Sequence, residues 1–139
     1  MNNQKVFLDS DSFIALSKPT DSNHIKAKKI HQQLLTQPTQ YFVSNLVFSE
    51  TITVISQKLG LDAARKFISS FKKKLVSNEF IYIYIDKKLE NLAIKIFNQQ
   101  TSKNISFVDC TNIAIYQKYQ LDSIFSFDKH YKKNGVVVL

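Results

Sequence analysis

Residues 6–9 read Val6-Phe7-Leu8-Asp9, a short apolar run that ends at an acid. A run of this kind near the start of a chain predicts a buried strand. Asp9 follows that strand directly, so we expect it at the strand's carboxyl edge. Ligands of open parallel sheets bind beyond the carboxyl ends of the strands, which makes Asp9 the first functional residue to consider.

The rest of the chain alternates short apolar runs with longer segments of helical periodicity. Further strands are predicted at 41–43, 80–85, 123–126 and 136–138, and helices at about 22–36, 45–59, 62–76, after 86, and at 106–119. This alternation predicts an α/β fold, with a central parallel sheet of about five strands and helices on both faces. With 139 residues and no linker or repeat, we expect a single domain over residues 1–139.

The composition limits the kinds of protein that this chain can be. Apolar residues make up 44%, which supports a packed core and excludes a disordered chain. The one cysteine, Cys110, excludes an intramolecular disulfide and a four-cysteine zinc site. No apolar run approaches the ~18 residues that span a bilayer, so we expect a cytoplasmic protein without a membrane partner.

The charge balance is strongly basic. Lys and Arg number 19 against 11 Asp and Glu, which gives a net charge of +8. Such an excess favours polyanionic partners, with nucleic acid first among them. An ordinary solvated surface rich in lysine is the alternative interpretation.

Glu50 is the most informative acid of the sequence. In the helix predicted at 45–59 it shares a face with Val47, Thr51 and Val54, and we expect this face to pack on the core. A carboxylate is rarely buried without a cationic partner or a metal. We therefore expect Glu50 to bind a metal, with a salt bridge to a buried lysine as the alternative.

Two further acids lie at the ends of predicted elements. Asp109 is near the start of the helix at 106–119, where Ser106 and Asp109 also have the spacing of a capping box. Asp128 follows the apolar run at 123–126, as Asp9 follows the first strand. An acid of a turn is the alternative interpretation of Asp128.

Together, the four acids form a candidate site. They come from separate elements that should converge on one sheet edge: Asp9, Glu50, Asp109 and Asp128. Close carboxylates repel one another unless they are neutralised, and Mg²⁺ and Mn²⁺ are cations that suit oxygen ligands. Such a metal site supports hydrolysis of phosphodiester bonds with water as the nucleophile. Lysines around it would hold the phosphate backbone.

Four short segments carry a resemblance to a known family. Residues 6–10, 44–50, 106–110 and 124–131 resemble, in this order, the motifs of PIN domains. The chain is most similar to the VapC-like ribonucleases, which are the toxins of bacterial toxin–antitoxin pairs. The resemblance implies a five-stranded parallel sheet and an endoribonuclease that uses Mg²⁺ or Mn²⁺. It also implies RNA as substrate, a cognate antitoxin and frequent homodimers, with Asp9, Glu50, Asp109 and Asp128 as the catalytic, metal-binding acids.

Four neighbouring residues are expected to support these acids. Asp11 stands where the family often has Ser, Thr or Asn, so the site carries an extra acid, whose other interpretation is a helix cap. Ser10 and Ser126 stand where threonine is common, and Ser126 is placed to orient Asp128. Asn112 lies one helical turn after Asp109, where it can hydrogen-bond that acid or a metal-bound water.

Other functions stay open at this level. Asp9 and Asp11 after a strand are also typical of a haloacid-dehalogenase-like phosphatase, but the late acidic pair of that class is missing. A phosphoacceptor receiver module would use Asp86, the acid at the end of the strand predicted at 80–85. Both alternatives leave Glu50 without a role. An RNA-binding PIN domain that has lost turnover is the third alternative.

Overall fold

The computed structural model describes residues 3–139, so residues 1 and 2 of the predicted domain lie outside the described residues. The elements are β1 (Gln4–Leu8), α1 (Ser10–Ser17), α2 (His24–Leu34), β2 (Thr39–Ser44), α3 (Asn45–Leu59), α4 (Leu61–Val76), β3 (Phe80–Ile83), α5 (Lys87–Asn98), α6 (Phe107–Lys118), β4 (Ser123–Phe125) and α7 (His130–Lys133). Within the described range, no helix combines the length and the apolar character needed to cross a membrane.

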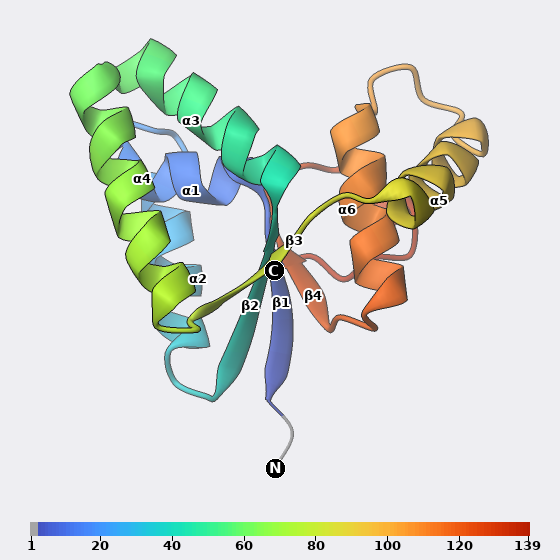
Figure 1. Cartoon of the computed structure of the whole chain (residues 1–139), viewed down its shortest axis with the longest axis horizontal. Helices are drawn as coiled ribbons and strands as arrows, with labels where there is room; N and C mark the ends of the chain where they lie inside the picture. The colour runs from blue at the N-terminus through green and yellow to red at the C-terminus, as the bar shows by residue number, and fades with distance from the viewer. Residues whose placement is uncertain (1–2) are drawn as a thin grey trace.

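The sheet is parallel and has the strand order β3-β2-β1-β4. Helices α1 to α4 lie on one side of it, and α5 and α6 lie on the other (Figure 1). This arrangement confirms the predicted α/β architecture. The run at 136–138, predicted as a fifth strand, contributes one isolated bridge between Val138 and Ile124.

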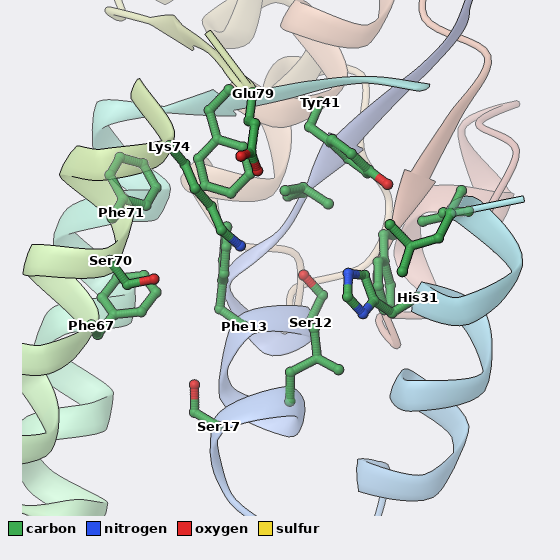
Figure 2. Close-up of a pocket in the computed structure, with 16 residues that line it drawn as sticks. Ser12, Phe13, Ser17, His31, Tyr41, Phe67, Ser70, Phe71, Lys74 and Glu79 are labelled. Atoms are coloured by element: carbon green, nitrogen blue, oxygen red, sulfur yellow. The ribbon is translucent and has the colours of Figure 1, made fainter. Parts of the chain in front are cut away.

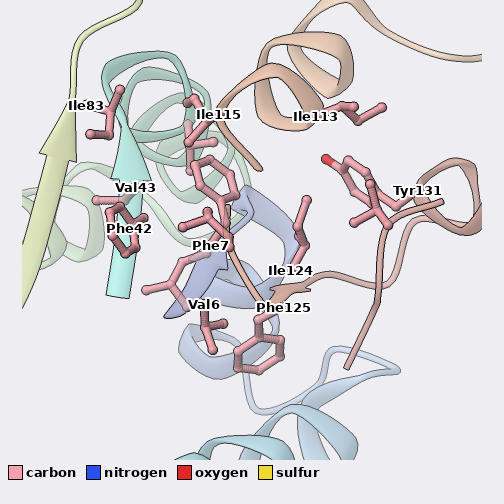
Figure 3. Packing of buried hydrophobic residues seen from close by; sticks show 14 of the residues in the cluster. Val6, Phe7, Phe42, Val43, Ile83, Ile113, Ile115, Ile124, Phe125 and Tyr131 are labelled. Atoms are coloured by element: carbon pink, nitrogen blue, oxygen red, sulfur yellow. The ribbon is translucent and has the colours of Figure 1, made fainter. Parts of the chain in front are cut away.

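The core occupies both faces of the sheet. Val6 and Phe7 of β1 are fully buried although their side chains point to opposite faces, which is the condition of a strand covered by helices on both sides. Figure 3 shows these two residues beside Ile124 of β4 in the buried cluster. Aromatic rings fill the layer under α1, α3 and α4, where the centroids of Phe48 and Phe71 lie 4.4 Å apart.

Local hydrogen bonds fix where the helices begin and end. The hydroxyl of Ser44 accepts a hydrogen bond from the Val47 amide at the start of α3, and the Asp86 carboxylate caps α5 in the same way. Gly60 separates α3 from α4 with a φ of 93°, a conformation that favours glycine. These caps explain why the periodic segments stop close to their predicted bounds.

We expect Ser44→Ala to destabilise the protein by about 1 kcal/mol, because it leaves the first turn of α3 without its cap. The Ser44 side chain is fully buried, so water cannot replace the lost acceptor. Urea unfolding followed by circular dichroism measures the change. Ser49→Ala, which alters an exposed serine of the same helix, should leave stability almost unchanged; equal effects of the two substitutions would contradict the capping role.

Candidate active site

The candidate site lies at the carboxyl ends of β1 and β4. In the order β3-β2-β1-β4, strands β2 and β3 follow on one side of β1, and β4 lies on its other side. The position between β1 and β4 is therefore a topological switch point, where ligands of open α/β sheets bind. The Asp9 amide donates to the Phe125 carbonyl at 3.2 Å, so the residues that follow each strand start side by side. Asp9 follows β1, and Ser126 follows β4.

The Asp9 carboxylate is held on both oxygens. Its side chain is 5% exposed and caps α1, with Oδ1 accepting from the Ser10 amide at 2.8 Å. The same oxygen accepts from Asn112 Nδ2 at 3.2 Å. Oδ2 accepts from Ser126 Oγ at 2.9 Å and from the Tyr131 hydroxyl at 2.7 Å. The chain thus fixes Asp9 from α1, α6, α7 and the loop after β4.

Asp109 reaches the same place from α6. Ser106 and Asp109 form the predicted capping box: Ser106 Oγ accepts from the Asp109 amide at 3.0 Å, and Asp109 Oδ2 accepts from the Ser106 amide at 3.1 Å. The other oxygen, Oδ1, lies 3.3 Å from the Tyr131 hydroxyl. Capping therefore uses one oxygen of Asp109 and turns the other toward Asp9.

Ser126, in the loop after β4, connects two further acids to the site, Asp11 of α1 and Asp128 of the same loop. Asp11 Oδ2 accepts from the Phe127 amide at 2.9 Å and lies 3.1 Å from Ser126 Oγ. Ser126 Oγ in turn accepts from the Asp128 amide at 3.1 Å. Asp128 is half-buried, and its Oδ1 accepts from the His130 amide at 2.8 Å. Ser126 therefore joins Asp9, Asp11 and the backbone of Asp128.

Glu50 differs from the expectation in its burial. The buried residues of α3 are Val47, Thr51 and Ile55, which are four residues apart, while Glu50 lies on the neighbouring row and is exposed. The expectation of a buried Glu50 was therefore wrong, because this helix buries a narrow stripe. Its charge still acts on Asp9, whose pKa it helps to raise. Glu50 thus stands on the open side of the acidic cluster.

Burial and mutual repulsion perturb the acids in the same direction. Burial raises the pKa of Asp109 to about 6, and the charges of Asp128 and Asp9 add to the shift. Burial also raises the pKa of Asp11 to about 7, with the charge of Asp9 as the second cause. The pKa of Asp9 is raised by burial as well. Such perturbed groups at a sheet edge are typical of functional sites.

The donor set fits a hydrated divalent cation. Among residues 3–139, no three Asp, Glu, His or Cys side chains lie close enough together to enclose a metal. Mg²⁺ does not need such a set, since it is commonly held by one or two carboxylates and keeps several waters. Asp11 Oδ1 and Asn112 Oδ1 are buried oxygens without a hydrogen-bond partner in the protein. The charge of a bound cation would relieve the repulsion between the acids.

The contacts of Asn112 and Tyr131 in the site were not predicted from the sequence. Asn112 donates to Asp9 and to Tyr131 rather than to its helical neighbour Asp109. Tyr131, whose hydroxyl contacts Asp9 and Asp109, was not singled out. Its position three residues after Asp128 was a weak signal, because α7 is four residues long and too short to show periodicity.

A cavity lined largely by apolar side chains is separate from the acids. It has a volume of about 340 Å³ and is lined by α1, α2, α4 and the sheet, with Phe67, Phe71 and Lys74 on the α4 side and His31 on the α2 side (Figure 2). None of the four predicted catalytic acids lines it. Leu8 and Ser12, which flank Asp9, form part of its wall. The cavity and the acidic cluster therefore lie on either side of the start of α1.

The fold and the acids at its sheet edge define a known class of nuclease-like domain. Residues 6–137 match the PIN domain. The chain therefore belongs to the PIN-domain family. It is 26% identical over 132 residues to the 23S rRNA-specific endonuclease VapC20 of Mycobacterium tuberculosis, with 95% of each chain covered.

Solved structures agree with this assignment. The crystal structure of VapC20, described as a sarcin–ricin loop cleaving toxin, has a TM-score of 0.81 and 25% identity, and the match covers 95% of this chain and 96% of that one. VapBC2 from Rickettsia felis, bound to a DNA fragment from its promoter, has a TM-score of 0.65 at 8% identity, with 98% of both chains covered. A toxin–antitoxin complex from Klebsiella pneumoniae has a TM-score of 0.59 at 16% identity, covering 88% of this chain and 86% of that one. These last two support the fold alone.

Proposed function

We propose that this protein is a divalent-metal-dependent endoribonuclease, a hydrolase of RNA phosphodiester bonds, and the toxin of a toxin–antitoxin pair. The observation that carries the proposal is the meeting of Asp9 and Asp109 at the carboxyl edge of β1, on either side of one hydroxyl. The similarity to an rRNA-specific endonuclease over 95% of both chains supports the same activity. The PIN match over 6–137 also supports one nuclease domain spanning residues 1–139.

Asp9 and Asp109 are the residues that would hold Mg²⁺ or Mn²⁺, with Asp128 and Glu50 at the margin of the site. When bound, the metal would activate water as a nucleophile and stabilise charge on the phosphate. Ser126 orients the acids by contacting both Asp9 and Asp11. The exposed side, where Glu50 stands, is the direction from which a phosphate could approach.

The basic surface suits an RNA substrate. The net charge is +8, and the one salt bridge in the described part of the chain joins Arg65 to Asp62 at 3.2 Å. The lysines are thus not neutralised by ion pairs within the protein and are available to phosphate groups. This charge supports binding to a polyanion, while the acidic cluster supports its hydrolysis.

Cleavage of defined RNAs tests the proposed activity. We would incubate the protein with a 23S rRNA fragment that contains the sarcin–ricin loop and with unrelated structured and single-stranded RNAs, in Mg²⁺, Mn²⁺ or EDTA. We expect cleavage with either metal and none in EDTA. Absence of cleavage of every RNA by protein that binds Mn²⁺ would favour the binding-only alternative.

A cognate antitoxin is the proposed protein partner. Two structures with the same fold are a toxin–antitoxin complex from Klebsiella pneumoniae and VapBC2 from Rickettsia felis, which supports this kind of partner. The phosphatase and receiver alternatives belong to other families, and the PIN match over 6–137 argues against both. Asp86, the acid that the receiver alternative requires, is exposed and caps α5.

We expect Glu50→Gln to lower the cleavage rate by roughly 10- to 100-fold, the range found when a group that supports a metal is removed. The thermal midpoint should hardly change, because the side chain is exposed. Steady-state cleavage and thermal unfolding measure the two effects. Glu90→Gln, at an exposed position of α5, is the matched control and should leave cleavage unchanged; an equally active Glu50→Gln would remove Glu50 from the site.

A further inference from the structure

Tyr131 places one hydroxyl among the acids of the site. Its side chain is fully buried, and Figure 3 shows it in the core cluster with Ile113 of α6 and Ile124 of β4. The hydroxyl lies 2.7 Å from Asp9 Oδ2 and 3.3 Å from Asp109 Oδ1. A buried tyrosine needs partners for its hydroxyl, and here the partners are the two acids proposed to hold the metal.

Counting protons assigns the direction of each hydrogen bond. Asn112 Nδ2 lies 2.9 Å from the Tyr131 oxygen and can only donate, so the tyrosine oxygen accepts this bond. The hydroxyl has a single proton, which goes to Asp9 Oδ2 as the nearer acceptor. Asn112 Nδ2 also donates to Asp9 Oδ1 at 3.2 Å. Tyr131 and Asn112 together therefore hold both oxygens of Asp9.

One oxygen of Asp109 is left without a hydrogen bond. Since the Tyr131 proton is directed to Asp9, Asp109 Oδ1 receives no hydrogen bond from it and stays available to a cation. The phenol ring is fixed by core packing, so the position of its oxygen is set by α7 and α6 rather than by the acids. The hydroxyl thus lies as a rigid spacer between the carboxylates of Asp9 and Asp109.

We propose that Tyr131 is a positioning residue, which fixes Asp9 at a set distance from Asp109 and so prepares the pair for a divalent cation. The inference rests on the proposed function and adds a residue to it. Groups that hydrogen-bond metal-binding carboxylates orient them, and their loss weakens metal affinity by about 10- to 100-fold. Tyr131 does not need to contact the RNA or the reacting phosphate for this role.

Tyr131→Phe tests the proposal because it removes the hydroxyl and keeps the packed ring. We expect the Kd for Mn²⁺, measured by isothermal titration calorimetry without RNA, to rise at least tenfold. In the cleavage assay kcat should fall by a similar factor at fixed metal concentration, while KM for the RNA stays unchanged. The thermal midpoint in EDTA and the circular dichroism spectrum verify that the variant is folded.

Tyr116→Phe is the matched control. Tyr116 lies on α6, and its hydroxyl accepts from the Val137 amide at 3.4 Å, away from the acids. A merely structural role of Tyr131 would lower the thermal midpoint in both variants and leave Mn²⁺ affinity equal to that of the wild type, and this result would overturn the proposal. If the wild type itself neither binds Mn²⁺ nor cleaves RNA, the proposed function fails first, and the inference fails with it.

Discussion

Asp9→Asn should reduce metal-dependent RNA cleavage by about 1,000-fold or more, the largest effect that we expect from any single substitution. A bound metal contributes several kcal/mol to stabilising the transition state, and about 4 kcal/mol corresponds to three powers of ten in rate. Asp9 accepts four hydrogen bonds at the carboxyl end of β1, so its carboxylate has one defined position. The amide of Asn keeps the shape but not the negative charge.

The measurement is kcat/KM for an RNA that the wild type cleaves, in Mg²⁺ and in Mn²⁺. Asp122→Asn is a suitable control, because Asp122 Oδ2 accepts from the Lys5 amide at 2.8 Å beside β1, far along the strand from Asp9. We expect this variant to keep wild-type cleavage. Thermal unfolding in EDTA should show that Asp9→Asn is folded. Cleavage that survives Asp9→Asn would point to a contaminating nuclease or to a different site.

The sequence predicted elements best where local and tertiary signals agree. The helix expected at 45–59 has the same bounds in the structure, because Ser44 caps its start and Gly60 ends it. A helix here was predicted only through the alternative role of Asp11 as a helix cap, and that role was wrong, because α1 begins at Ser10 and Asp9 caps it. The serine-rich sequence of α1 has little hydrophobic periodicity. The run at 136–138 lacked the pairing that makes a strand, and a single bridge to Ile124 is formed.

For the candidate site, topology was predictable and side-chain contacts were not. A strand followed by an acid placed Asp9 at the sheet edge, and Ser106 with Asp109 showed the spacing of the cap that forms. Whether Glu50 is buried depends on the width of the apolar face that α3 packs on the core, and periodicity does not give this width. The partners of Asn112 lie 19 and 103 residues away in the sequence, and only folding brings them together.

In EDTA, the protein should lose thermal stability as the pH rises from about 5 to 8. The folded-state pKa of Asp109 is about 6 and that of Asp11 about 7, both raised from 3.8. The unfolded chain therefore releases these protons at lower pH than the folded protein, and each further unit of pH favours unfolding until the folded acids have ionised. Allowing for coupling between the acids, we expect the free energy of unfolding to fall by roughly 2 kcal/mol from about pH 5 to 8, which lowers the thermal midpoint by about 5 °C.

A variant at Asp11 separates this effect from other titrations. Asp11→Asn should raise the thermal midpoint at pH 8 and flatten the pH dependence between about 6 and 8, because one repelling carboxylate is removed from the buried cluster. Asp62→Asn, at an exposed position whose partner is Arg65, should follow the wild-type curve. A midpoint in EDTA that stays constant or rises from pH 5 to 8 in the wild type would contradict the raised pKa values.

Divalent metal should restore the thermal stability that the protein loses at high pH. A cation that binds the folded protein alone stabilises it by about 2.7 kcal/mol at a concentration one hundred times its Kd. It also competes with protons for the same oxygens, so its effect grows as the acids ionise. We therefore expect excess Mg²⁺ or Mn²⁺ to raise the midpoint more at pH 8 than at pH 5, and to do so weakly in Asp9→Asn. This measurement needs no RNA, so it tests whether the acids hold a metal even when the substrate is not known. An equal effect of the metal at both pH values would place the cation elsewhere.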